Sequence, residues 1–190
     1  MASELKKILK ELFLVLVLCT FGGVAAGLIL NSMENELYKI PGLLVLLPAV
    51  LAMRGNISGA IGSRLGSALH LGLIEPRFKW NPALADNIWA SLILNVVMSF
   101  LLGIVAAVAY FLFFPSDANL GILGLIIKLT TISLIAGTGA GIILTALSVF
   151  IAIATYSYGL DPDNVVNPIL LTTGDILTVL CLLLTAKFFV

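Results

Sequence analysis

An acidic residue stands in the middle of the last apolar stretch of the chain. Asp175 is followed by isoleucine, leucine, threonine and valine, and at about 1.5 Å of rise per residue it would lie about 15 Å from either end of that apolar stretch. A carboxylate at that depth in a membrane costs about 2.5–3.5 kcal/mol to insert, so it must face water, an ion or a polar partner. Asp175 is therefore the first candidate for an ion site. The alternative is an aspartate that only joins helices through hydrogen bonds.

More oxygen-bearing side chains precede Asp175 in the same stretch. Projected at about 100° per residue, Asn164 lies about 20° from Asp175 on an ideal helix. Asp161 lies about 40° from it and Asn167 about 80°. Carboxylate and amide oxygens, without histidine or cysteine, suit hard cations such as Mg²⁺, Mn²⁺ or Ca²⁺. One side of this helix therefore predicts a divalent-cation site, with Asp175, Asn167 and Asp161 as metal ligands.

A second polar segment occurs earlier in the chain, in PAVLAMRGNISGAIGSRLGSAL at residues 48–69. Its glycines recur at steps of four, three and four residues and form one stripe on a helix: Gly55, Gly59, Gly62 and Gly66. Such a stripe allows another helix, or a pore lined by backbone, to approach closely. Helix packing alone also explains it.

The same segment carries two arginines at a depth where a lipid-facing helix is not charged. We expect Arg54 and Arg64 either to extend toward the membrane surface or to be ion-pair partners of a carboxylate such as Asp161 or Asp175. His70, near the end of the segment, is interpreted as an interfacial residue because the chain has no second histidine to join it at a metal.

Uncharged polar residues recur at helical spacing in two further segments, as Asn87, Ser91, Asn95 and Ser99 and as Thr138, Gly141, Thr145 and Ser148. We expect both seams to join helices inside a bundle and assign them no chemistry. The sequence has no phosphate-binding glycine loop, no serine nucleophile motif and no paired metal-binding cysteines, which disfavours an enzyme.

Composition places all of these residues in a membrane. The chain has 190 residues, 61% hydrophobic and 11% charged, whereas soluble domains are about 25% charged. A membrane span needs about 20 apolar residues, and we predict spans at 9–30, 41–71, 87–114, 120–158 and 161–190. The predicted fold is an all-α integral membrane protein with five transmembrane helices, forming one membrane domain over 1–190.

The stretch 120–158 leaves the number of spans open. A single helix of that length would reach about 58 Å, well beyond a hydrocarbon core of about 30 Å. The run Gly137, Thr138, Gly139, Ala140, Gly141 is its weakest point, because glycine costs up to about 1 kcal/mol relative to alanine in a helix. We predict one long, tilted or kinked helix, and the alternative is two short spans and six in total.

Charge distribution orients the five spans. Basic residues cluster on one predicted side, at Lys6, Lys7, Lys10, Arg77 and Lys79, and are fewer on the other, at Lys39 and Lys187. Because cytoplasmic loops carry the excess of lysine and arginine, we expect a multi-pass protein of the cell membrane with its amino terminus in the cytoplasm and its carboxyl terminus outside.

Two strings resemble the membrane domain of the MgtE magnesium channels and, more closely, the solute carrier family 41 magnesium transporters. The first is PAVLAMRGNISGAIGSRLGSAL at 48–69, with a proline, a basic residue before glycine and asparagine, and then serine, arginine and leucine. The second is LDPDNVVNPILLTTGDILTVL at 160–180, with Asp-Pro, Asn-Pro and a Thr-Thr element before the acid. Both strings coincide with the polar segments described above.

The resemblance implies a pore at a twofold interface, lined by the second and fifth helices of each half. Asp175 would then be the pore aspartate, its symmetry mate supplying a second carboxylate, with Asn167 in the pore and Asp161 nearer the cytoplasmic mouth. The other expected pore-lining residues are Gly55, Asn56, Gly59, Asn164 and Leu171. The transported ion would be Mg²⁺, while Mn²⁺, Co²⁺ and Ca²⁺ stay open.

Two departures from these families bear on the expectation. Fewer than a dozen residues precede the first span, so we expect no cytoplasmic regulatory domain of the MgtE kind. The animal carriers fuse two such membrane domains, so we expect this single one to form a homodimer in the bilayer, without nucleic acid. The other hypotheses are a nonconducting membrane scaffold and an intramembrane enzyme that uses Arg54, Arg64 and Asp175 on a lipid phosphate.

Overall fold

The computed structural model describes residues 2–114 and 121–190, with every side chain in these ranges except those of residues 2–8, 10, 11 and 162–164. Its helices are α1 (Ala2–Asn31), α2 (Glu34–Lys39), α3 (Leu43–His70), α4 (Pro82–Phe113), α5 (Gly121–Ser157) and α6 (Pro162–Lys187). Five of them, all except α2, contain stretches long and apolar enough to cross a membrane. The prediction of an all-α membrane protein is therefore confirmed.

The region that left the number of spans open forms one helix. α5 continues without a break through 37 residues, including the glycine run near its middle. Three residues of that run are buried against neighbouring helices: Gly137, Ala140 and Gly141. Packing against α3 and α4 therefore outweighs the low helix propensity of glycine, and five spans replace the alternative of six.

Two helix boundaries differ from the prediction. The polar run 31–39 was expected to be a connection, but it folds into the short helix α2. The third span was expected to begin at Asn87, whereas α4 begins at Pro82. Its first turn is stabilised by Asn81, whose side-chain oxygen accepts a hydrogen bond of 2.7 Å from the backbone nitrogen of Leu84.

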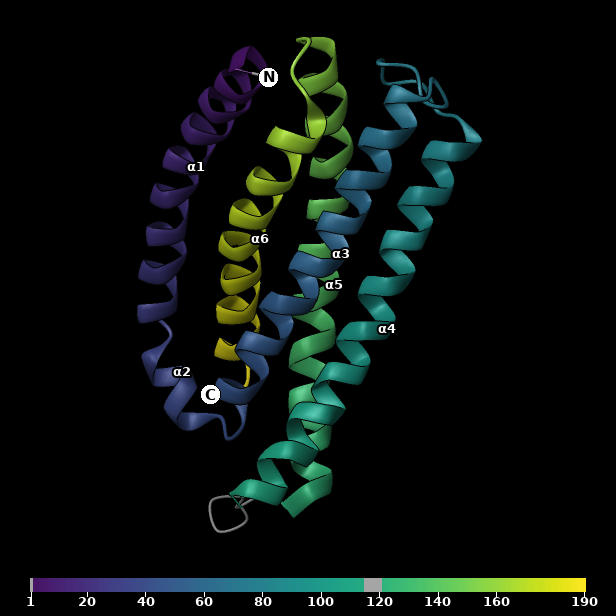
Figure 1. Cartoon of the computed structure of the whole chain (residues 1–190). Helices are drawn as coiled ribbons and strands as arrows, with labels where there is room; N and C mark the ends of the chain where they lie inside the picture. The colour runs from purple at the N-terminus through teal and green to yellow at the C-terminus, as the bar shows by residue number, and fades with distance from the viewer. Residues whose placement is uncertain (1, 115–120) are drawn as a thin grey trace.

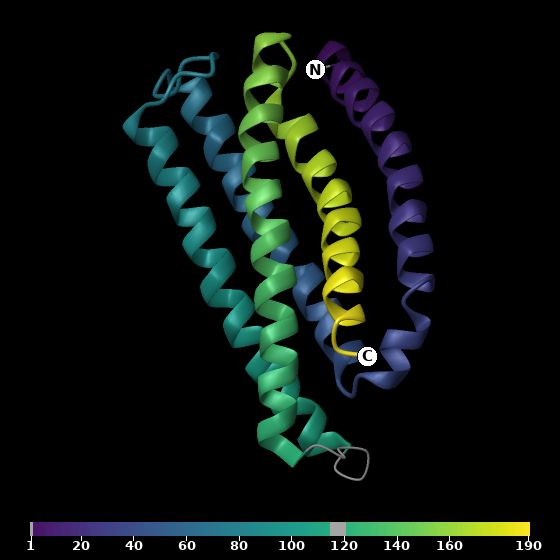
Figure 2. The same cartoon turned by 180° about the vertical axis from the view of Figure 1, so that it is seen from behind.

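The helices form a bundle in which α6 lies between α1 and the remaining spans (Figure 1). α5 lies behind α3 and α6 in this view and in front of α3 when the molecule is turned (Figure 2). The amino terminus lies at the same end of the bundle as the α3–α4 and α5–α6 connections, and the carboxyl terminus lies near α2 at the other end. This arrangement matches five alternating spans.

The predicted polar seams lie inside the bundle, between α4 and α5. The hydroxyl groups of Ser91 and Thr145 are 2.8 Å apart, and the hydroxyl of Ser133 donates to the backbone carbonyl of Ser99 over 2.7 Å. These side chains are buried, so they face neighbouring helices and not lipid. The expectation that they join helices is confirmed.

Candidate ion-binding site

A hollow of about 600 Å³ lies between α3 and α6, near the middle of both helices. Its lining residues are Leu51, Ala52, Gly55, Asn56 and Gly59 on α3 and Asn167, Leu171 and Asp175 on α6. Six of these eight were expected from the sequence to line an ion path. The structure brings them together, and their role as ion ligands stays a prediction.

The Asp175 carboxylate is partly exposed to this hollow. In the described part of the chain, neither a hydrogen bond nor an ion pair reaches it. The alternative of an aspartate that joins helices through hydrogen bonds therefore has no support within one chain. A partly exposed, unpaired carboxylate is instead free to meet water or a cation.

The glycine stripe of α3 divides into two parts. A methyl group added at Gly59 would meet no atom within 4 Å, so this glycine borders open space. One added at Gly62 would lie 2.6 Å from the side-chain oxygen of Asn167 on α6. Gly59 thus borders the hollow, whereas Gly62 lets α3 and α6 approach each other, and the role of the stripe in a pore stays a prediction.

Asn167, which lines the hollow, also contacts a side chain of α3 that lies outside it. Its side-chain nitrogen donates a hydrogen bond of 3.2 Å to the hydroxyl of Ser63 on α3. Its side-chain oxygen is buried and has no hydrogen-bond partner among the described residues. The sequence analysis did not single out this contact.

Neither arginine of α3 pairs with a carboxylate in the described part of the chain, contrary to the ion-pair option. Arg54 is 4% exposed, and one of its terminal nitrogens donates to the backbone carbonyl of Gly137 on α5. The Nε of Arg64 donates to the side-chain oxygen of Asn87 on α4 over 2.8 Å. Neutral oxygen acceptors on α4 and α5 therefore replace the expected partners Asp161 and Asp175.

Asp161 does not reach the hollow. It precedes α6, about 20 Å along the helix from Asp175, and its carboxylate lies 3.9 Å from Nε2 of His70 at the end of α3. The two predicted acidic ligands therefore lie far apart along the axis, because Asp161 precedes the first residue of α6 and Asp175 lies near its middle. The side chain of Asn164 lies outside the described residues.

Sequence reasoning missed two lining residues, Leu51 and Ala52. Ala52 lies three positions before Gly55 and seven before Gly59, so the helical period that revealed the glycines could have included it. Leu51 offers no such signal because it is one apolar residue among many. Both are positioned by α3 as a continuous helix.

One chain brings a limited set of donors to the hollow. Among the described residues, no three histidine, cysteine, aspartate or glutamate side chains converge as a metal cluster. Asp175 supplies a carboxylate, while Asn56 and Asn167 supply amide groups. Such donors suit a hard cation that keeps several water ligands, which is the usual behaviour of Mg²⁺ in proteins.

Comparison with known proteins points to the kind of ion that these oxygen donors suit, a divalent cation. Residues 47–185 match the family model MgtE, described as divalent cation transporter. Human solute carrier family 41 member 2 is 28% identical over 171 residues, which cover 88% of this chain and 29% of that protein. Solute carrier family 41 member 3 of Rattus norvegicus is 27% identical over 176 residues, covering 92% of this chain and 37% of the relative. The chain spans about a third of the length of these relatives. The resemblance inferred from the two polar strings is confirmed, and the chain belongs to the MgtE family.

Proposed function

We propose that this protein transports a divalent cation, with Mg²⁺ as the favoured ion, past the hollow between α3 and α6. The observation that carries the proposal is the Asp175 carboxylate, which lies near the middle of the apolar helix α6 on a hollow of about 600 Å³ with no protein partner in the described part of the chain. The description of the MgtE family and the names of the relatives' solute carrier family support the same reading.

The assembly proposed is a homodimer in which the hollows of two copies face each other. In a twofold dimer the same surface of both subunits meets, so two Asp175 carboxylates would flank one path. Two carboxylates balance the charge of one divalent cation. The amide groups of Asn56 and Asn167 would then hold its water ligands.

The chain is proposed to lie with its amino terminus in the cytoplasm. Arg77 and Lys79 in the α3–α4 connection lie at the same end as the amino terminus, while Lys39 of α2 lies near the carboxyl terminus. An excess of basic residues marks the cytoplasmic side of membrane proteins. Cation entry into the cell would then run from the end near α2 to the end near the amino terminus.

Transport measured in liposomes tests the proposal. We expect purified protein to carry Mg²⁺ into vesicles that contain a magnesium-sensitive dye, and the Asp175→Asn variant to lose at least nine-tenths of the initial rate. Glu75→Gln is the matched control. Glu75 is exposed in the α3–α4 connection, so this substitution removes the same charge outside the hollow. An Asp175→Asn variant that transports at the wild-type rate would contradict the assignment of Asp175 to the path.

A further inference from the structure

One face of α3 is polar on one side of the level of Asp175 and apolar on the other side. On an ideal helix, Ser63, Ser67 and His70 lie within about 40° of Asn56, so these four residues share one face. All four are exposed within the single chain. They extend from the hollow to the end of α3 where the amino terminus also lies. Hydroxyl, amide and imidazole groups exposed along a membrane span require water or a polar partner.

The other half of the same face is apolar. Ala52, Ala49 and Val45 also lie within about 40° of Asn56, and they extend toward the end of α3 that adjoins α2. Beyond Asp175 on α6, Thr178 and Leu182 are fully buried. The polar surface beside Asp175 therefore continues in one direction only.

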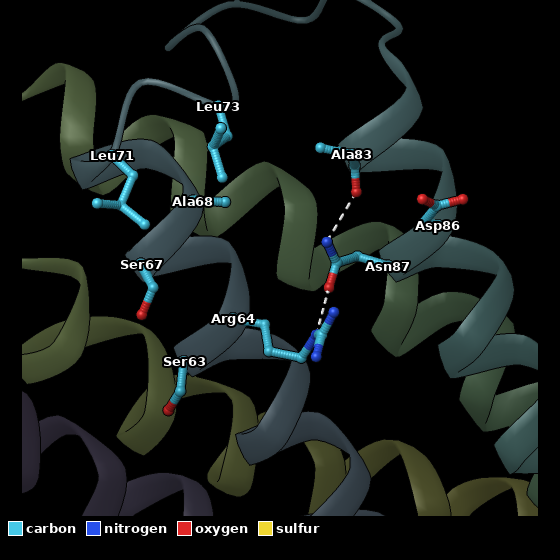
Figure 3. A pocket seen from close by; sticks show the side chains of 9 residues that line it. All are labelled: Ser63, Arg64, Ser67, Ala68, Leu71, Leu73, Ala83, Asp86 and Asn87. Atoms are coloured by element: carbon cyan, nitrogen blue, oxygen red, sulfur yellow. Dashed lines mark hydrogen bonds between the residues drawn. The ribbon is translucent and has the colours of Figure 1, made fainter.

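A second cavity lies at the polar end of this face. It has a volume of about 440 Å³ and is lined by Ser63, Arg64, Ser67, Ala68, Leu71 and Leu73 together with Ala83, Asp86 and Asn87 of α4. Figure 3 shows Arg64 reaching from α3 to Asn87, which in turn donates to the carbonyl of Ala83 over 2.7 Å. Arg64 is thus held in place through its Nε, and its two terminal nitrogens make no hydrogen bond in the described chain.

Ser63 connects this cavity to the hollow. It lines the cavity, and its hydroxyl oxygen accepts the hydrogen bond from Asn167, which lines the hollow. A hydroxyl that accepts one hydrogen bond keeps its own proton free to donate. Ser63 can therefore hold a water molecule of the cavity while it orients the amide of Asn167.

We propose that this polar face and the cavity form a water-filled vestibule through which the ion passes between Asp175 and the end of the bundle that holds the amino terminus. The apolar half of the face, from Ala52 to Val45, is the barrier on the other side, where a narrow apolar passage excludes water. The arrangement is a conformation open toward one side of the membrane. This inference rests on the proposed transport function and adds the direction of access and the residues that provide it.

The charges of the vestibule give it a further property. Arg64 and Asp86 line the same cavity, and no ion pair joins them in the described chain. A fixed positive charge repels an approaching cation and a fixed negative charge attracts it. These two residues therefore set the local cation concentration at the mouth, in opposite directions.

Cysteine accessibility tests the vestibule. Single cysteines are introduced at Ser63, Ser67, Ala49 and Val45 in a background with Cys19→Ala and Cys181→Ala. Each variant in liposomes is then treated from either side with a positively charged thiol reagent that does not cross the membrane. We expect Ser63→Cys and Ser67→Cys to react at least tenfold faster when the reagent is on the side of the α3–α4 connection. Mg²⁺ should slow that reaction, and Ala49→Cys and Val45→Cys should resist the reagent from both sides. Val97→Cys is the control, because Val97 is 47% exposed on α4 and faces lipid in the proposed dimer.

The outcomes separate this inference from the proposed function. Equal resistance of Ser63→Cys, Ser67→Cys and Val97→Cys would place the serines in lipid or in a protein contact and overturn the vestibule. Fast reaction of Ala49→Cys and Val45→Cys would overturn the apolar barrier. Both results leave the Asp175→Asn transport assay unaffected. Where a cysteine variant does not fold, transport by Arg64→Gln and Asp86→Asn at low ionic strength tests the cavity instead. We expect Arg64→Gln to lower the Mg²⁺ concentration for half-maximal transport and Asp86→Asn to raise it. Identical values for the two variants would overturn the role of the cavity.

Discussion

The side-chain nitrogen of Asn167 on α6 lies 3.2 Å from the hydroxyl oxygen of Ser63 on α3, and this contact joins the two helices at the edge of the hollow. Hydrogen bonds between helices inside membranes contribute about 0.6 kcal/mol on average. We therefore expect a double-mutant cycle of Ser63→Ala and Asn167→Ala, measured by unfolding in mixed detergent micelles, to give a coupling energy of about 0.6 kcal/mol. Strictly additive variants would show that the two side chains do not interact.

The same substitution at two glycines of α3 should change the stability of the protein by different amounts. Alanine at Gly62 places its methyl group against Asn167, Val166 and Leu170, whereas alanine at Gly59 meets no atom within 4 Å. Both changes gain the same helix propensity, so their difference reports packing alone. We expect Gly62→Ala to destabilise the protein by about 1–3 kcal/mol and Gly59→Ala to cause no loss. Unfolding midpoints in mixed micelles measure both, and equal midpoints would contradict the close approach of α3 and α6.

The buried charge of Arg54 should weaken cation binding. Its guanidinium donates to the carbonyl of Gly137, its other terminal nitrogen has no partner among the described residues, and the next residue, Gly55, lines the hollow. A positive charge in a medium of low dielectric constant repels a nearby cation. We expect Arg54→Met to fold and to bind Mg²⁺ several-fold more tightly.

Thermal stability measured across a series of Mg²⁺ concentrations reports this affinity. Arg54→Lys is the control, because it keeps the charge and should retain the wild-type affinity. Weaker binding by Arg54→Met would show that the guanidinium supports the site by holding its geometry.

The proposed homodimer brings Ala52 of one copy near Ala52 of the other. Ala52 is exposed within the single chain and lines the hollow, and a twofold axis between facing hollows brings a residue close to the axis near its own copy. In the background with Cys19→Ala and Cys181→Ala, oxidation of Ala52→Cys should yield a disulfide-linked dimer on a denaturing gel. Trp89→Cys, exposed on α4, should stay monomeric, and the reverse result would place the interface on α4.

Orientation can be measured with the two exposed lysines at opposite ends of the bundle. In the same background, Lys79→Cys in the α3–α4 connection should react with an impermeant maleimide only after the cells are permeabilised. Lys39→Cys at the end of α2 should react in intact cells. The opposite pattern would invert the proposed topology and with it the side on which the vestibule opens.

The fold was predictable from the sequence where hydrophobic length decides it. Each span is an apolar run of about 20 residues or more, which is the length that a bilayer requires, and the predicted start of the last span at 161 is one residue before the beginning of α6 at Pro162. α2 was missed because most of its six residues are polar and it is too short to show a helical pattern. The continuity of α5 followed from burial of its glycines, which a propensity scale does not include.

The candidate site was predictable where a polar residue is costly in lipid, as at Asp175 and Asn56. Two kinds of contact were not. The acceptor for Arg54 is the backbone carbonyl of Gly137, and no pattern of side chains encodes a backbone acceptor on another helix. The Asp161 carboxylate lies beside His70 at the end of α3, and an angle on a helical projection does not show which side chain of another helix lies next to a residue.

The first helix of the chain packs along the last one. Most side chains in the membrane-crossing stretch of α1, Leu12–Asn31, are exposed or half-buried, and the Cys19 thiol donates to the carbonyl of Pro168, 149 positions later. During synthesis, α1 enters the bilayer first, yet its partner α6 emerges last. A helix that is apolar on all sides is stable in lipid without a partner. α1 is therefore stable as an independent span until α6 has been synthesised, and the bundle closes only after α6 has packed against it.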